Sequence, residues 1–154
     1  FRVALIAFST FALVTAADQR ASCLERIHRH LEPGGLLLVD LPNPSGGGAS
    51  DARIESHFRI PPRGHQVDKL VEERSLPAGR QRWIRYLYTV SRWTDGAIVD
   101  RFEVGFGLAR LERREVEQSM YAAGFDIERV LGDYREHPHG VHSPRMVFHA
   151  RRLS

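Results

Sequence analysis

The fold is decided by the stretch Leu31-Glu32-Pro33-Gly34-Gly35-Leu36-Leu37-Leu38-Val39-Asp40. Proline cannot continue a helix and glycine accepts a left-handed cap, so Pro-Gly-Gly predicts the end of a helix over residues 16–31. The aliphatic run that follows predicts a strand buried on both faces, and the apolar residues 1–8 predict another. Strand, helix and strand of these lengths form a βαβ unit, for which we expect a right-handed crossover.

Outward from this unit, the 154 residues predict a single α/β domain in four parts. Proline, glycine and serine are frequent after the second strand, which indicates a loop or lid. Turn signals then separate three antiparallel strands, and a helix with two last strands completes the chain. The βαβ unit, the lid, the antiparallel insertion and the final part are expected at residues 1–41, 42–66, 67–110 and 111–154.

Composition and charge exclude several classes of protein. The chain is 42% hydrophobic and 27% charged, which is typical of a soluble globular domain. Its net charge of +3 comes from interspersed basic and acidic residues, so we expect no nucleic-acid partner. The single cysteine, Cys23, excludes an internal disulfide and favours the cytoplasm. No apolar run reaches the roughly 18 residues that cross a membrane, although a secreted chain cleaved after Ala16 or Ala17 is an alternative.

Several motifs carry a resemblance to a known family. The stretch at 31–40 resembles the junction between a helix and the fifth strand of class I S-adenosylmethionine-dependent methyltransferases. Residues 1–11 resemble the fourth strand of that family with its following loop, and Asp18-Gln19 resembles the start of the next helix. The Ala-Gly-Phe ending at residues 123–125 and the segment Ser143-Pro144-Arg145 resemble the entries into the sixth and seventh strands.

The resemblance implies S-adenosylmethionine as cofactor and a partial doubly wound, Rossmann-like methyltransferase sheet. Its strand order would be 4-5-7-6, with the antiparallel three-strand insertion on the substrate side. The family's glycine-rich cofactor loop does not precede Phe1, so we expect the C-terminal part of an N-terminally truncated domain. The apolar edge of strand 3–8 would then be exposed, which predicts a homodimer or another association through it.

The resemblance also places four residues near the methyl donor. The rings of Phe8 and Phe11 would pack beside the cofactor, and Ser9 or Thr10 would hydrogen-bond its amine or the substrate. The alternative for these residues is a loop cap with core packing. Methyl transfer needs mainly the alignment of nucleophile and sulfonium, so no catalytic residue can be named.

Candidates on the substrate side lie in the middle of the chain. They are His57, Tyr86 and Tyr88, although a strand that carries tyrosines is more often simply a packed face. Arg145 is expected to anchor a loop carboxylate such as Asp133. The leading hypothesis is a methyltransferase that acts on a small molecule, and the alternative is a non-catalytic oligomerisation or binding module derived from the same fold.

Three further patterns favour structural interpretations. The segment 105–110 resembles a dinucleotide loop, but Arg110 occupies the third glycine position, which favours a bulge or an edge twist. The glycines at 46–48 favour a hinge of the lid over a phosphate cradle. A zinc or nickel site at His137, His139 and His142 lacks a fourth ligand nearby, so we expect no metal.

Overall fold

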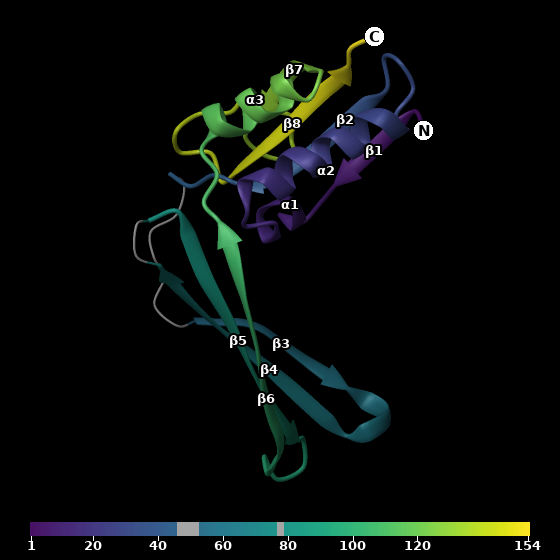
Figure 1. The fold of residues 1–154 in the computed structure, drawn as a ribbon. Helices are drawn as coiled ribbons and strands as arrows, with labels where there is room; N and C mark the ends of the chain where they lie inside the picture. Colours follow the sequence, from purple (N-terminus) through teal and green to yellow (C-terminus); the bar gives the residue numbers. More distant parts are fainter. Residues whose placement is uncertain (46–52, 77–78) are drawn as a thin grey trace. The chain divides into compact units, whose positions relative to one another are not determined.

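The computed structural model describes residues 1–45, 53–76 and 79–154, which group into two compact units (Figure 1). The first unit is formed by residues 1–48 with 109–154, and the second by residues 49–108. The sequence predicted one domain, and the division falls at the ends of the antiparallel segment. The predicted hinge at residues 46–48 lies outside the described residues.

The first unit contains a four-stranded mixed sheet with the order β1-β2-β8-β7. β1 and β2 are parallel, with Val3 opposite Leu36, whereas β8 is antiparallel to both β2 and β7. These elements confirm the α/β class and the predicted strands. Their bounds are β1 (Val3–Ile6), β2 (Leu36–Pro42), β7 (Phe125–Leu131) and β8 (Arg145–Arg152).

Helices cover one face of this sheet. They are α1 (Thr10–Leu13), α2 (Ala17–His30) and α3 (Arg113–Ala122). α2 and α3 contact each other and lie side by side over the strands (Figure 1). Gly34 adopts a left-handed φ of 75° after α2, which confirms the predicted turn into β2.

Burial alternates over the first four residues of β2 rather than including every side chain. Leu37, Val39 and Leu41 are buried toward the helices, whereas Leu36 and Leu38 on the other face are only partly covered. The prediction of strands buried on both faces was therefore wrong for the described residues. The reason is that α2 and α3 share one face. The largest fully buried side chains all belong to this unit: Phe125, Phe148, Leu24, Leu37, Leu41, Met120, Met146, Val39 and Val116.

The second unit is a four-stranded sheet with the order β3-β4-β5-β6, in which β4 is antiparallel to β3 and β5. The sequence predicted three strands, and the additional strand β3 lies within the predicted loop or lid. Its polar sequence hides the strand pattern, and its pairing with β4 is what holds it. The bounds are β3 (Arg53–Ile60), β4 (His65–Ser75), β5 (Gln81–Arg92) and β6 (Ile98–Ala109).

The turn between β3 and β4 also departs from the expected loop. A short 3-10 helix over Pro61–Arg63 ends at Gly64, which has a left-handed φ of 62°. Proline at the start of the helical turn and glycine at its end are the residues that this geometry favours. None of the helices formed by the described residues is long and apolar enough to span a bilayer.

Candidate functional site

The chain turns sharply at the carboxyl end of β1. Phe8 and Ser9 both have left-handed backbone angles, with φ of 54° and 62°. Residues other than glycine rarely adopt this conformation, and consecutive cases persist only where the surroundings enforce them. Ser9 is also the N-cap of α1, which anchors the segment through the buried side chain of Phe11.

Asp40, near the end of the neighbouring strand β2, holds this turn. Its side chain is buried, and the residue is only 4% exposed. Oδ2 accepts a hydrogen bond of 3.1 Å from the Phe8 amide, and the Asp40 carbonyl accepts one of 3.2 Å from the Ser9 amide. Both amides of the strained turn are therefore bound by one residue.

Arg145, the first residue of β8, completes the arrangement. Its Nη2 donates to Asp40 Oδ2 at 2.7 Å and its Nε donates to Oδ1, which makes the pair bidentate. The same Nη2 donates to Ser9 Oγ at 3.1 Å. Asp40, Arg145 and the Phe8–Ser9 turn thus form one connected network, called here the turn network.

The expectation that Arg145 anchors Asp133 was wrong. The β2–β8 register places Arg145 opposite Pro42, on the same sheet face as Asp40 and within reach of it. Asp133 instead accepts a hydrogen bond from His137 Nδ1 at 2.7 Å. That bond is the main reason why the pKa of Asp133 is lowered.

Tyr134 adds an aromatic ring to the turn network. Its hydroxyl donates to Asp40 Oδ2 at 2.8 Å, and its ring centroid lies 5.5 Å from the Arg145 guanidinium. Burial of the hydroxyl, followed by its bond to Asp40, raises the pKa of Tyr134 and keeps it a donor. The residue is nevertheless 67% exposed, so the ring presents its surface to solvent.

The carboxylate of Asp40 is buried and receives four donors from the protein. Oδ2 receives the Phe8 amide, the Tyr134 hydroxyl and Nη2 of Arg145, and Oδ1 receives Nε of Arg145. Because the residue is only 4% exposed, a substrate has little access to this carboxylate. Asp40 is therefore suited to organise the turn and unsuited to act as a general base.

The four predicted cofactor residues lie in different environments. Phe8 is 89% exposed, whereas Phe11 is buried in the core, so the two rings do not form one aromatic surface. Ser9 is partly buried within the turn network. The Thr10 hydroxyl donates to the Ala7 carbonyl.

The predicted substrate-side residues lie in the second unit, on opposite faces of its sheet. His57 is opposite Asp68, to which its Nδ1 is hydrogen-bonded, and Asp68 is opposite Thr89 on β5. Since side chains alternate along a strand, Tyr86 and Tyr88 face the other way from Thr89 and hence from His57. The structure therefore does not bring His57 together with the two tyrosines.

The tyrosines take part in aromatic pairs across the sheet. Tyr88 stacks on Phe102 with ring centroids 4.7 Å apart, and Tyr86 meets Phe106 edge to face at 5.2 Å. The ammonium of Lys69 lies 3.7 Å from the centroid of the Tyr86 ring. These contacts agree with the packed-face interpretation of the strand.

The glycine pattern at 105–110 belongs to a strand. Gly105 and Gly107 lie within β6, and a Cβ atom on Gly105 would come 2.6 Å from Cζ2 of Trp83. Glycine there leaves room for the indole ring, so the segment is no phosphate loop.

The sequence also raised a metal site at His137, His139 and His142. No group of three histidine, cysteine or acidic side chains that could hold a metal occurs within residues 1–45, 53–76 and 79–154.

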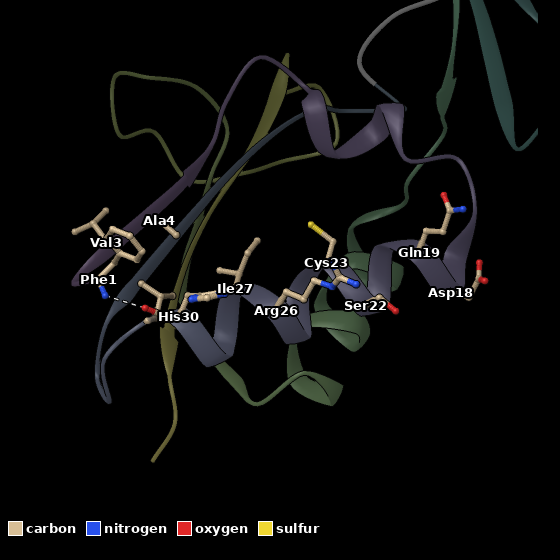
Figure 2. A pocket seen from close by; sticks show the side chains of 11 residues that line it. Phe1, Val3, Ala4, Asp18, Gln19, Ser22, Cys23, Arg26, Ile27 and His30 are labelled. Atoms are coloured by element: carbon tan, nitrogen blue, oxygen red, sulfur yellow. Dashed lines mark hydrogen bonds between the residues drawn. The ribbon is translucent and has the colours of Figure 1, made fainter.

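A groove of about 750 Å³ runs between β1 and α2 (Figure 2). Val3 and Ala4 line it from the strand, and Cys23 and Ile27 line it from the helix. Burial raises the pKa of Cys23, which favours the neutral thiol. β1 is the edge strand of its sheet, and its side chains Val3 and Leu5 are exposed.

Asp40, Tyr134 and Arg145 were not among the sequence-derived site residues. An acid that ends an apolar strand was a usable signal for Asp40, because a buried carboxylate requires a partner. The partners themselves lie 94 and 105 residues further along the chain, and no local pattern connects them.

No protein-family model and no curated protein matches the sequence. Solved structures do match, and they show that the chain has the fold of S-adenosylmethionine-dependent methyltransferases. One is such a methyltransferase from Clostridium acetobutylicum, with 12% identity and a TM-score of 0.79. A sugar N-methyltransferase from Streptoalloteichus has 17% identity and a TM-score of 0.79, and an amino pentose methyltransferase from Micromonospora echinaspora has 19% and 0.77.

These alignments include nearly all of the present chain but only part of each neighbour. They cover 100%, 100% and 99% of the chain, and 59%, 57% and 58% of the three neighbours in the same order. The chain therefore spans less than two thirds of the length of these structures.

Proposed function

We propose that this chain forms part of a methyltransferase that transfers a methyl group from S-adenosylmethionine to a small molecule. The strained Phe8–Ser9 turn, held at the carboxyl end of β1, is the observation that carries the proposal. Open α/β sheets bind their ligands outside the carboxyl ends of parallel strands. The fold shared with known methyltransferases supports the same conclusion.

Under this proposal, β1, β2, β8 and β7 correspond to strands 4, 5, 7 and 6 of the family. The observed order β1-β2-β8-β7 agrees with that correspondence. β1 then lies next to the position where the doubly wound fold changes direction, so the turn after β1 forms one wall of the ligand crevice.

The turn residues fit the chemistry of the cofactor. S-adenosylmethionine supplies an electrophilic methyl group on a positively charged sulfur. The exposed ring of Phe8 offers an aromatic face, which attracts cations. The Ser9 and Thr10 hydroxyls offer polar partners beside it, and Phe11 supports them from the core. Their task is to bind and orient, which supplies most of the rate enhancement in a methyl transfer.

The substrate is proposed to be a small molecule, as the neighbours described as sugar methyltransferases suggest. His57 and the tyrosines cannot serve one ligand together, because they lie on opposite faces of the second sheet. His57 is the stronger candidate, since the bond from Nδ1 to Asp68 orients the ring and leaves Nε2 for a substrate proton.

Calorimetric titration with S-adenosylmethionine, which carries the positive charge on sulfur, tests the proposal. We expect saturable binding by the chain and a loss of about tenfold in affinity for Phe8→Ala, since one desolvated aromatic contact contributes on this order. Tyr121→Ala removes another exposed aromatic ring, on α3, and should leave the affinity unchanged. A folded chain that does not bind the ligand would contradict the proposal for this chain.

The second candidate function is a non-catalytic oligomerisation module. The edge strand β1, with Val3 and Leu5 exposed, favours association, because an uncovered apolar edge pairs readily with another strand. Sedimentation analysis of the chain and of Leu5→Lys separates the two functions. A discrete dimer that Leu5→Lys dissociates, and that does not bind S-adenosylhomocysteine, would favour the module.

A further inference from the structure

The turn network points to a role for two residues that the proposed function leaves unassigned. We propose that Asp40 and Arg145 are positioning residues, which keep Phe8 and Ser9 in their left-handed turn and direct the Ser9 hydroxyl toward the ligand. This inference rests on the proposed function, because the ligand is S-adenosylmethionine or a close analogue.

The first step is the unusual backbone. Phe8 and Ser9 occupy a conformation that their side chains disfavour, and the exposed Phe8 ring gains little packing in return. The turn persists because Asp40 binds both of its amides and Arg145 binds the Ser9 side chain. Strain maintained by a dedicated set of bonds is a feature of sites where a precise backbone placement matters.

The second step concerns the direction of the Ser9 hydroxyl. Arginine has only donors, so Arg145 Nη2 fixes Ser9 Oγ as an acceptor toward the protein. The hydroxyl proton then remains to be donated, and an acceptor oxygen such as a ligand carboxylate matches it. The Thr10 hydroxyl has the opposite polarity, because its proton is donated to the Ala7 carbonyl and its lone pairs remain. A group that carries both a carboxylate and an ammonium suits this pair.

The third step is that the side chains of Asp40 and Arg145 are both engaged in holding the turn. Asp40 is buried and binds the Phe8 amide, the Tyr134 hydroxyl and Arg145, and Arg145 uses a planar fork that reaches two partners at once. Lysine retains the charge of arginine but cannot reproduce this fork. Arg145→Lys therefore separates the positioning role from the charge.

Arg151 offers a matched control. It lies on the same strand as Arg145, and its Nε donates to Glu128 Oε1 at 2.8 Å in an exposed ion pair. Hydrogen exchange at the Phe8 and Ser9 amides, calorimetry with S-adenosylhomocysteine and thermal melting are measured for the native chain, Arg145→Lys and Arg151→Lys. We expect Arg145→Lys to accelerate exchange at both amides and to weaken binding, each by about tenfold, as the loss of a charged hydrogen bond predicts. Arg151→Lys should change neither.

Ser9→Ala distinguishes positioning from a purely structural role. It retains the backbone bonds to Asp40 and removes only the hydroxyl, so exchange at Phe8 should stay protected while affinity falls. If Arg145→Lys leaves the affinity or the amide exchange unchanged, the positioning role alone would be overturned. A native chain that binds no S-adenosylhomocysteine would instead overturn the proposed function, and the exchange data would still show whether Arg145 holds the turn.

Discussion

The two units bury their apolar side chains to very different degrees. In the first unit, helices cover one face of the sheet, and residues such as Phe125 and Phe148 are completely buried. In the described part of the second unit, the buried hydrophobic residues are Val67, Val71 and Ile84, whereas Phe102 is 48% exposed. The first unit is therefore stabilised mainly by a packed core, and the second by pairs across its strands.

The pairs in the second unit are polar as well as aromatic. Arg85 Nε donates to Glu72 Oε2 at 2.9 Å, and Arg82 Nη1 donates to Glu73 Oε1 at 2.6 Å. Such pairs between neighbouring strands each contribute a fraction of what a buried side chain contributes. The comparison teaches that single substitutions should affect the two units unequally.

The largest expected effect comes from removing one phenylalanine in each unit. Phe148→Ala should lower the free energy of unfolding by about 3–5 kcal/mol, because it leaves a cavity in a closed core. Phe102→Ala should cost only about 1 kcal/mol, since the ring mainly loses its stacking on Tyr88. Urea unfolding of both variants measures the difference, and equal losses would refute the contrast between the units.

Phe8→Gly should increase the stability of the first unit by about 1 kcal/mol, because glycine adopts the left-handed angle without strain. Phe8→Ala retains the Cβ atom and should gain nothing. Thermal melting of the two variants provides the measurement. A melting temperature for Phe8→Gly at or below that of Phe8→Ala would show that the turn is not strained.

The ion pairs of the two sheets should differ less in their contribution to the free energy of unfolding. Glu72→Gln weakens a partly buried pair in the second unit and should cost about 0.5–1 kcal/mol. Glu128→Gln, which affects the more exposed pair with Arg151 in the first unit, should cost close to nothing. Urea unfolding at low and high salt compares them, and a larger loss for Glu128→Gln would reverse the interpretation.

The smallest effect is a dependence on pH. Burial, followed by the charge of Arg129, lowers the pKa of His149 below its usual 6.5. The unfolded chain then binds a proton just below pH 6.5 where the folded chain does not, so stability should rise with pH through that range. His149→Gln should flatten this rise in urea titrations at several pH values. His142→Gln, at an exposed position, is the control, and an unaltered slope in His149→Gln would contradict the assignment.

Much of the first unit could be predicted because its signals are local. The Pro33-Gly34-Gly35 turn, the spacing of apolar residues in α2 and α3, and the glycine after α3 all act within a few residues of the chain. The same local logic failed for β3, whose polar residues form a strand only because β4 offers its edge. The local signals also did not show that β1 and β2, the two strands of the βαβ unit, have one sparsely covered face.

For the candidate site, the sequence by itself predicted a place, and only the tertiary structure determined which residues are hydrogen-bonded there. The sequence predicted a strand over residues 1–8 and a loop after it, and the structure ends β1 at Ile6 and has the turn at Phe8 and Ser9. The pairing of Asp40 with Arg145 and Tyr134, the burial of Phe11 and the separation of His57 from the tyrosines emerged only from the folded chain. The physical reason is that hydrogen bonds between distant residues depend on strand register, which is set by the packing of whole sheets.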